Sequence, residues 1–314
     1  MSVPPSLVCL GNLTLDDVVL PDGSEHPACT GGDALYAVLA ARAWLASAQM
    51  VAPVGHDLPA ALLTHMQALG LDAAGLPRRD LPTLRNRVVY RAGGERDWTL
   101  YADDDTFHAL SPRPDDIPPP WRAAPAFLIL AMTLAAQQSL VSALAEHPNA
   151  LIALDPQEDY ILGNEAAIRT MLANVDIFLP SAIEAQRLTG TTDWERAAKQ
   201  LAAAGPSVVV IKLGAEGCLI YDAKRDHCQR IPAWPLADIV DTTGAGDSFC
   251  GGFMAALAVA HDDLAGAARA GTVAASFTVA GYGAEPLMSA SPADIRQRLV
   301  QWDATLEGFK CVSN

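Results

Sequence analysis

Short apolar runs alternate with longer amphipathic segments along most of the 314-residue chain. The apolar runs have the length of buried strands, and they predict strands at residues 7–10, 49–54, 127–131, 151–154, 175–179 and 208–213. The longer segments predict helices, among them residues 32–45, 58–69, 246–260, 263–280 and 292–306. This alternation predicts a three-layer α/β/α fold around a mostly parallel central sheet, with ligands at the carboxyl ends of the strands.

Two regions break the alternation. Residues 16–30 and 86–101 have the pattern of short strands and turns, with Gly93-Gly94 as a hairpin turn. Together they predict a small β-sheet, a lid, over the edge of the main sheet. The proline-rich residues 111–125 predict a loop that returns from the lid to the core, and a linker between two domains is the alternative.

The most informative segment reads Asp241-Thr242-Thr243-Gly244-Ala245-Gly246-Asp247-Ser248-Phe249. Two glycines bracket an alanine, an acid follows, and the nearly uncharged residues 250–260 continue as a predicted helix. The first N–H groups of a helix have no internal partner, and glycine lets an anion approach the backbone. We therefore expect an anion-binding turn beside Asp247, as phosphoryl transfer to an alcohol requires. The alternative is a tight turn whose acid only complements the helix dipole.

Charge and composition narrow the range of partners. The formal net charge is −15, which argues against nucleic acid and against anionic membranes. A polyanionic nucleotide would then need magnesium and backbone N–H groups to neutralise it. The six cysteines form no C-x-x-C pair and the seven histidines have no metal-ligand spacing, so we expect reduced thiols and no zinc site. The sequence shows no signal peptide, and its most apolar stretch, residues 123–136, is too short to span a bilayer, so we expect a cytoplasmic protein.

The nine-residue segment resembles the C-terminal signature of the ribokinase-like (PfkB-type) carbohydrate kinases almost letter for letter. The resemblance implies a single kinase domain over residues 1–314, with a lid formed by about residues 12–30 and 83–106. It implies transfer of the γ-phosphate of ATP to a hydroxyl of a sugar or sugar-like substrate. Asp247 would be the general base, and the N–H groups of Gly244, Ala245 and Gly246 would hold the charge on the transferring phosphoryl group.

Two earlier segments fit the family's substrate site. Gly11-Asn12-Leu13-Thr14-Leu15-Asp16 follows the first strand, and Asp16 stands where the family has an acid that accepts hydrogen bonds from substrate hydroxyls. A turn aspartate, or a shift of the role to Asp17, is the alternative. Thr30-Gly31-Gly32-Asp33-Ala34-Leu35-Tyr36 resembles the family's double-glycine motif, so Gly31, Gly32, Asp33 and Tyr36 are predicted substrate residues. Tyr36 replaces a frequent Asn, and it would either stack on a substrate ring or narrow the pocket.

Further positions match the family's nucleotide and metal site. Glu184 stands in the family's Asn-x-x-Glu motif with Ser181 in place of Asn, and with Asp241 it would help to place Mg²⁺. The alternative for Glu184 is a surface pair with Arg187. The resemblance assigns the remaining nucleotide contacts to Lys212, Gly214, Gly217, Thr242, Thr243 and Gly283. For Lys212 the alternative is a half-buried lysine at a strand end. In some family members the loop at Gly281-Tyr282-Gly283-Ala284 joins Asp241 and Thr243 around a monovalent cation such as K⁺.

The sequence lacks the motifs of several other enzyme classes. No Walker A loop, protein-kinase catalytic loop, HExxH motif or nucleophile elbow occurs, and no Gly-x-Gly-x-x-Gly follows the first strand, which argues against an oxidoreductase. A nucleoside kinase of the same fold and a catalytically silent ligand-binding member are the alternatives to a sugar kinase. A homodimer that pairs through the lid is a further expectation from the family. Asp155 is a pocket candidate by its position at a strand end.

Overall fold

The computed structural model describes residues 4–20, 22–91 and 96–312. At its centre is an eight-stranded sheet whose strands, from one edge to the other, are β12 (His227–Ile231), β11 (Cys218–Asp222), β10 (Val208–Lys212), β9 (Ile177–Phe178), β8 (Leu151–Leu154), β7 (Ala126–Ile129), β1 (Val8–Leu10) and β4 (Gln49–Val51). The six strands from β10 to β4 pair in parallel, and β11 and β12 add an antiparallel edge. The predicted mostly parallel sheet is confirmed.

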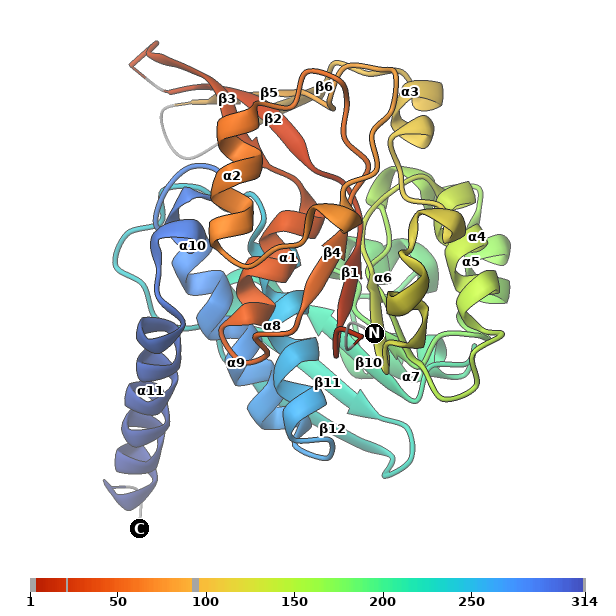
Figure 1. The fold of residues 1–314 in the computed structure, drawn as a ribbon. Helices are drawn as coiled ribbons and strands as arrows, with labels where there is room; N and C mark the ends of the chain where they lie inside the picture. The colour runs from red at the N-terminus through yellow and green to blue at the C-terminus, as the bar shows by residue number, and fades with distance from the viewer. Residues whose placement is uncertain (1–3, 21, 92–95, 313–314) are drawn as a thin grey trace.

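Helices cover both faces of this sheet (Figure 1). One face packs against α1 (Asp33–Arg42), α2 (Ala60–Ala68), α8 (Ala245–Val259), α9 (Leu264–Thr278), α10 (Glu285–Ser289) and α11 (Pro292–Val312), and the other against α4 (Leu134–Leu144), α5 (Glu165–Leu172), α6 (Ala182–Thr189) and α7 (Trp194–Ala202). Strand β1 shows why: Cys9 packs into the first apolar layer, while its neighbours Val8 and Leu10 pack into the second. The three-layer prediction is confirmed.

A second, four-stranded sheet lies over one end of the main sheet (Figure 1). Its order is β3 (Glu25–Gly31), β2 (Thr14–Val19), β5 (Asn86–Tyr90) and β6 (Arg96–Leu100). Since β1 ends at Leu10 and β2 begins at Thr14, this lid is joined directly to the carboxyl end of β1. The helix α3 (Asp104–Ala109) follows β6, and the predicted hairpin turn at Gly93-Gly94 lies outside the described residues.

The proline-rich residues 111–125 pack against the core, which argues against a linker between domains. They form two short 3-10 helices, η2 (Pro114–Asp116) and η3 (Pro119–Ala123). The side chains of Ile117 and Trp121 are buried in the apolar layer under α4. Proline suits such short turns because its φ is already fixed and it has no N–H to satisfy.

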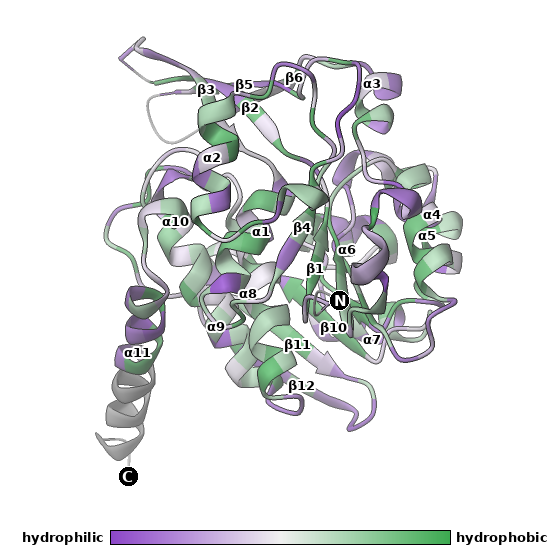
Figure 2. Ribbon diagram, in the orientation of Figure 1, coloured by the Kyte–Doolittle hydropathy of each residue, from purple (hydrophilic) through white to green (hydrophobic). Residues whose placement is uncertain are grey.

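Hydropathy follows the layers. In Figure 2 the central strand β1 is largely hydrophobic, whereas much of the outer lid strand β3 is hydrophilic. The five cysteines whose side chains the structure describes are free thiols: Cys9, Cys29, Cys218, Cys228 and Cys250. Within the part of the chain that the structure describes, no helix has the length and apolar character that a membrane span needs.

Candidate active site

A cavity of about 180 Å³ lies where the lid meets the starts of α1 and α8. It is lined by Asn12, Thr14, Asp16, Gly32, Asp33, Tyr36, Leu84, Asn86, Leu100, Phe107, Ala131, Gln157, Thr243 and Asp247. The lining brings together residues from the lid, from the double-glycine segment and from the nine-residue segment. Four of the five predicted substrate residues and the predicted base therefore share one cavity.

Asp16 enters the cavity from the lid strand β2. Its side chain is buried, and its Oδ1 accepts a hydrogen bond of 2.8 Å from Nδ2 of Asn86 on the neighbouring strand β5. Burial raises the pKa of Asp16 to about 6, although the hydrogen bond from Asn86 works in the opposite direction. Asp17 does not line the cavity, and its carboxylate instead accepts the N–H of Ala28 at 3.2 Å. The geometry therefore favours Asp16 over Asp17 as the cavity acid.

The two glycines before α1 permit a close approach of the chain to itself. A Cβ on Gly31 would lie 2.5 Å from Oδ2 of Asp16, so only glycine leaves room for that carboxylate. Gly32 has φ +103° and packs against the carbonyl of Asn12, and it also lines the cavity. Asp33 follows, and its Oδ1 accepts the N–H groups of Asn12 and Ala34. One carboxylate oxygen of Asp33 is thus used to hold the turn between β1 and β2.

The nine-residue segment forms the predicted turn and helix start. Gly244 precedes α8 with φ +76°, in the left-handed region, and Asp247 lies in the first helical turn. The N–H of Ala245 donates to the carbonyl of Thr242 at 3.3 Å, whereas the N–H groups of Gly244 and Gly246 find no acceptor in the described part of the chain. The expectation of three free amides is therefore wrong for Ala245, because the turn itself uses that donor.

Tyr36 connects α1 to this turn. A Cβ placed on Gly244 would lie 2.5 Å from the ring of Tyr36, so the ring packs directly on the glycine backbone. The tyrosine is only 2% exposed. The contact with Gly244 and the burial of the side chain favour the narrower pocket over stacking on a substrate ring.

Behind the turn, Lys212 and Asp155 form a buried ion pair. The Nζ of Lys212 lies 2.7 and 2.6 Å from the two carboxylate oxygens of Asp155, and the side chains are 14% and 5% exposed. Burial alone would lower the pKa of Lys212, but Asp155 and Cys250 outweigh it and raise that pKa. The ammonium group lies beside Gly246, since a Cβ there would be 3.4 Å from Nζ. Lys212 is therefore a cation at the mouth of α8.

Asp247 carries a perturbed carboxyl group. Burial and the negative charge of Asp155 raise its pKa to about 6, and Lys212 acts in the opposite direction. Its charge in turn adds to burial in raising the pKa of Asp33. A carboxyl with a pKa near the working pH is suited to general base catalysis.

Glu184 lies at the start of α6, and its environment argues against the alternative of a surface pair with Arg187. The carboxylate accepts the N–H of Ser181 at 2.6 Å in a capping box, and the side chain is buried. Arg187 pairs with Glu158 at 2.9 Å instead. Burial, reinforced by Asp155, raises the pKa of Glu184 to about 7. A bound cation would stabilise the ionised form of this buried carboxyl.

The remaining predicted nucleotide positions lie on turns. Gly214 is exposed in the turn after β10, and Gly217 packs against the backbone at Ile231 with φ +91°, which accounts for glycine without a ligand. Asp241 is buried and accepts the N–H of Thr243 at 2.8 Å. Thr242 is exposed.

The Gly281–Ala284 loop reaches the lid. The N–H of Ala284 donates to the carbonyl of Thr30 on β3 at 2.9 Å, and the rings of Tyr282 and Tyr90 lie 5.1 Å apart. A Cβ on Gly283 would be 3.0 Å from the same Thr30 carbonyl. This loop is therefore a contact between the lid and the C-terminal helices.

The acids at this site could supply only part of a magnesium coordination shell. No group of three or more His, Cys, Asp or Glu side chains in the described residues is arranged to hold a metal by itself. Mg²⁺ commonly binds through one or two carboxylates and completes its shell with waters and substrate phosphates. The buried, electrostatically unfavourable carboxyl of Glu184 is compatible with that mode.

Sequence reasoning missed several lining residues, of which Asn86 is the most informative. Asparagine is uncommon inside strands, so Asn86 in a predicted lid strand was a signal for a polar role. Gln157 and Phe107 offered no comparable signal, because only the folded chain brings them to the cavity.

Comparison with known proteins identifies related sequences and structures. Residues 28–290 match the model of the pfkB family of carbohydrate kinases. The chain is 29% identical over 253 residues to a cytidine kinase of Thermococcus kodakarensis, covering 79% of this chain and 87% of the relative. It is 34% identical over 137 residues to a ribokinase of Staphylococcus aureus, covering 42% of each.

Solved structures share the fold. A ribokinase from Giardia lamblia superposes with a TM-score of 0.78 at 20% identity, covering 96% of this chain and all of that one. A ribokinase from Arabidopsis thaliana complexed with ribose and ATP gives 0.75 at 22% identity, covering 95% and 99%. The family match spans most of the sequence and the fold agrees with it, so the chain belongs to the pfkB carbohydrate kinase family, whose members are phosphotransferases with a hydroxyl group as acceptor.

Proposed function

We propose that this chain acts as a single ATP-dependent kinase unit that phosphorylates a hydroxyl of an uncharged sugar or nucleoside, with Asp247 as general base. One observation carries the proposal. Asp247 lines the cavity from the first turn of α8, beside the unpaired N–H groups of Gly244 and Gly246. A base and an anion-binding turn are thereby within reach of one reacting oxygen.

In the proposed reaction the acceptor hydroxyl attacks the γ-phosphorus of ATP. A bond forms between that oxygen and phosphorus, the bond to the β–γ bridging oxygen breaks, and the proton passes to Asp247. The products are a phosphate monoester and ADP. The N–H groups of Gly244 and Gly246, and the ammonium group of Lys212 beside them, would stabilise the charge on the transferring group.

Magnesium, when bound with ATP, supplies charge neutralisation at the phosphates. Glu184 would hold it from the start of α6, with Asp241 as a second predicted ligand. The low count of acids around Glu184 is consistent with a cation that keeps water and phosphate in its shell. A K⁺ requirement and a dimer that pairs through the lid stay predictions.

The cavity favours an acceptor without charge. Asp16, Asp33 and Asp247 line it, and no Lys, Arg or His is among its lining residues in the described chain. A phosphorylated sugar would meet three carboxyl groups and no cation. Neutral hydroxyls, by contrast, can donate to Asp16, as the family resemblance implies.

A nucleoside is a specific second candidate because the cavity lining is mixed. Leu84, Leu100 and Phe107 contribute apolar side chains to it beside the polar ones. A nucleoside has an apolar base face and a hydroxylated sugar, which suits such a lining. The similarity to a cytidine kinase over 87% of that protein also supports this candidate.

The test is ADP release from Mg-ATP with a panel of neutral acceptors: ribose, fructose, cytidine, uridine, adenosine and inosine, and fructose 6-phosphate as the charged comparison. The proposal predicts turnover with at least one neutral acceptor and little with the sugar phosphate. Binding of an acceptor without ADP release would instead support a catalytically silent member. A strong preference for the sugar phosphate would contradict the inferred electrostatic selection.

A further inference from the structure

Strand β5 of the lid carries two buried polar side chains on one face. Every second residue from Asn86 to Tyr90 is buried, because alternate side chains of a strand share a face. At one end of this face Asn86 donates to the carboxylate of Asp16 at 2.8 Å. At the other end, roughly 13 Å further along the strand, the hydroxyl of Tyr90 lies 3.4 Å from that of Thr243. One strand therefore contacts both the cavity acid and the nine-residue segment.

The ring of Tyr90 is held by its neighbours in the lid and by the C-terminal loop. Tyr90 is 7% exposed and packs with Val18 and Val88 in the small apolar cluster of the lid. Its ring lies 5.1 Å from that of Tyr282, at an interplanar angle of 60°. The position of its hydroxyl is therefore set by the lid.

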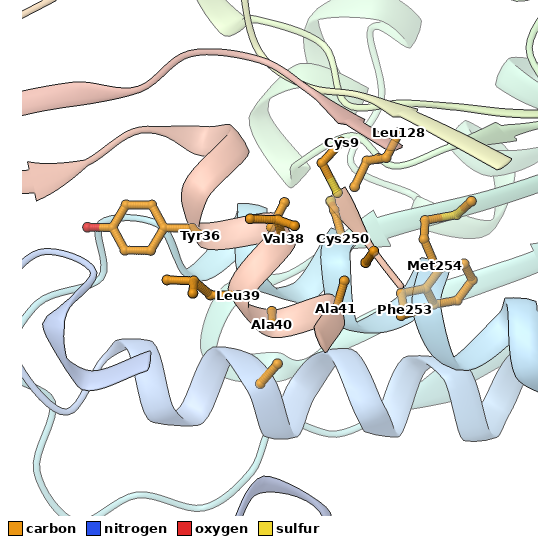
Figure 3. Packing of buried hydrophobic residues seen from close by; sticks show 14 of the residues in the cluster. Cys9, Tyr36, Val38, Leu39, Ala40, Ala41, Leu128, Cys250, Phe253 and Met254 are labelled. Carbon is orange, nitrogen blue, oxygen red and sulfur yellow. The ribbon is translucent and has the colours of Figure 1, made fainter. Parts of the chain in front are cut away.

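Thr243 is the residue through which this hydroxyl contacts the anion-binding turn. Its N–H donates to Asp241 at 2.8 Å, and Gly244 follows it directly. Gly244 packs against the ring of Tyr36, which Figure 3 shows at the edge of the packed apolar side chains, with its hydroxyl pointing away from them. The turn is thus contacted by Tyr36 from the core and by Tyr90 from the lid.

The separation of the two hydroxyl oxygens, 3.4 Å, is long for a hydrogen bond. The usual O···O distance is about 2.7–2.8 Å. Hydrogen bonds in active sites are often long before substrates bind, and they tighten in the reacting complex. The accuracy of that complex matters, because a misplacement of about 1 Å can lower a rate roughly 10²-fold.

We propose that Tyr90 is a positioning residue, whose hydroxyl holds Thr243 and so fixes the anion-binding turn relative to the cavity. This inference rests on the proposed function. The contact joins residues 153 positions apart, so no local motif contains it. Because Asn86 and Tyr90 belong to one strand, that strand sets the acid that receives the acceptor and the turn that receives the phosphoryl group.

The test is a double-mutant cycle of Tyr90→Phe and Thr243→Val. Phenylalanine keeps the ring contacts of Tyr90, and each substitution removes one of the two hydroxyls. The acceptor is whichever of the six neutral compounds named above the wild type phosphorylates fastest. For Tyr90→Phe we expect kcat/KM for ATP to fall about 3- to 10-fold, as for the loss of one hydrogen bond, while the acceptor KM stays within about twofold. In the Thr243→Val background the same change should cost less than about twofold.

Two further variants separate positioning from packing. Thr243→Ser keeps the hydroxyl, so Tyr90→Phe should again cost about 3- to 10-fold in that background. Tyr221→Phe is the matched control, because Tyr221 is 8% exposed, lies on β11 and uses its hydroxyl at 3.0 Å on Asp226. We expect this control to leave kcat and both KM values unchanged.

Three results overturn the inference: an unchanged kcat/KM for ATP in Tyr90→Phe, an equal effect of Tyr90→Phe with and without Thr243→Val, or an equal loss in Tyr221→Phe. If the wild type phosphorylates none of the six acceptors, it is the proposed function that fails. The same cycle is then measured as the Kd for Mg-ATP, with the same ratios expected. Additive changes in that Kd, or no binding of ATP, then overturn the inference.

Discussion

The Nζ of Lys212 lies 2.6 Å from Oδ2 of Asp155, at the ends of two parallel strands and directly behind the turn into α8. This ion pair places a positive charge beside Gly246 and a negative charge near Asp247. It thus influences both the anion-binding turn and the proposed base.

Replacement of Asp155 by Asn is predicted to destabilise the protein. Removing one partner of a buried ion pair leaves the other charge uncompensated and commonly costs about 3–5 kcal/mol. Chemical denaturation of the wild type and of Asp155→Asn measures this loss. The combined replacement of Asp155 by Leu and Lys212 by Met should recover much of the stability but not the activity, and equal stability of Asp155→Asn and the wild type would contradict the prediction.

Gly244→Ala is predicted to lower kcat by roughly 10²-fold or more, because the new Cβ would displace Tyr36 or the N–H donor beside it. Gly190→Ala is the matched control. Gly190 has φ +71° but no atom within 4 Å of its Cβ position, so it has the same backbone strain without the collision. Steady-state kinetics and Tm of both variants separate the two effects. Equal losses of activity in the two variants would refute a specific role for the Tyr36–Gly244 contact.

The fall of kcat/KM at acidic pH should begin near pH 6. Asp247 and Asp16 must be ionised to accept a proton or hydrogen bonds, and burial raises the pKa of each to about 6. Below that value kcat/KM should fall by up to about 100-fold per pH unit, since two groups become protonated. A profile that is flat between pH 5 and 7 would contradict both assignments.

Asp16→Asn provides the control for this profile. It should raise the acceptor KM and leave only Asp247 to titrate, so the fall at acidic pH should flatten to about tenfold per pH unit. An unchanged slope would indicate that Asp16 does not contribute to it.

Glu184→Gln should act on magnesium and on the pH dependence of stability. We expect the Mg²⁺ concentration for half-maximal rate to rise roughly 10- to 100-fold, as for residues that orient a metal site. Burial raises the pKa of Glu184 to about 7, so the folded protein favours the protonated carboxyl. The protonated carboxyl therefore contributes fully to the free energy of unfolding at a pH below the ordinary pKa of glutamate, and this contribution is lost as the pH rises through 7. Ligand-free Tm of the variant should therefore exceed that of the wild type more at pH 8 than at pH 5. The reverse trend would contradict a raised pKa for the buried carboxyl of Glu184.

The fold was largely predictable because the parallel strands are buried on both faces and their apolar runs are unambiguous. Val208 to Ile211 is an example, and it became part of β10 as expected. The predicted strand at residues 49–54 ends earlier, at Val51, since the chain leaves the sheet edge there. The helix α11 continues to Val312, beyond the predicted residue 306, although Gly308 follows the predicted end.

The site was predictable only in part. Asp16, Tyr36 and Asp247 were found from local motifs, and the structure places all three on one cavity. The partner of Asp16 is 70 residues away, and the partner of Lys212 is 57 residues away. No local pattern could supply those contacts, and the Lys212–Asp155 pair depends on the ends of β10 and β8, which lie on either side of β9 in the sheet.

The most direct test of the central claim is the turnover of Asp247→Asn with saturating acceptor and Mg-ATP. The account predicts that kcat falls roughly 10²- to 10⁴-fold, while ATP still binds with a Kd within about twofold of the wild type. Because the substitution removes a carboxyl whose pKa is raised by burial, the variant should also melt at or above the wild-type Tm near pH 7.5. A folded Asp247→Asn protein with unchanged kcat would contradict the assignment of Asp247 as the base.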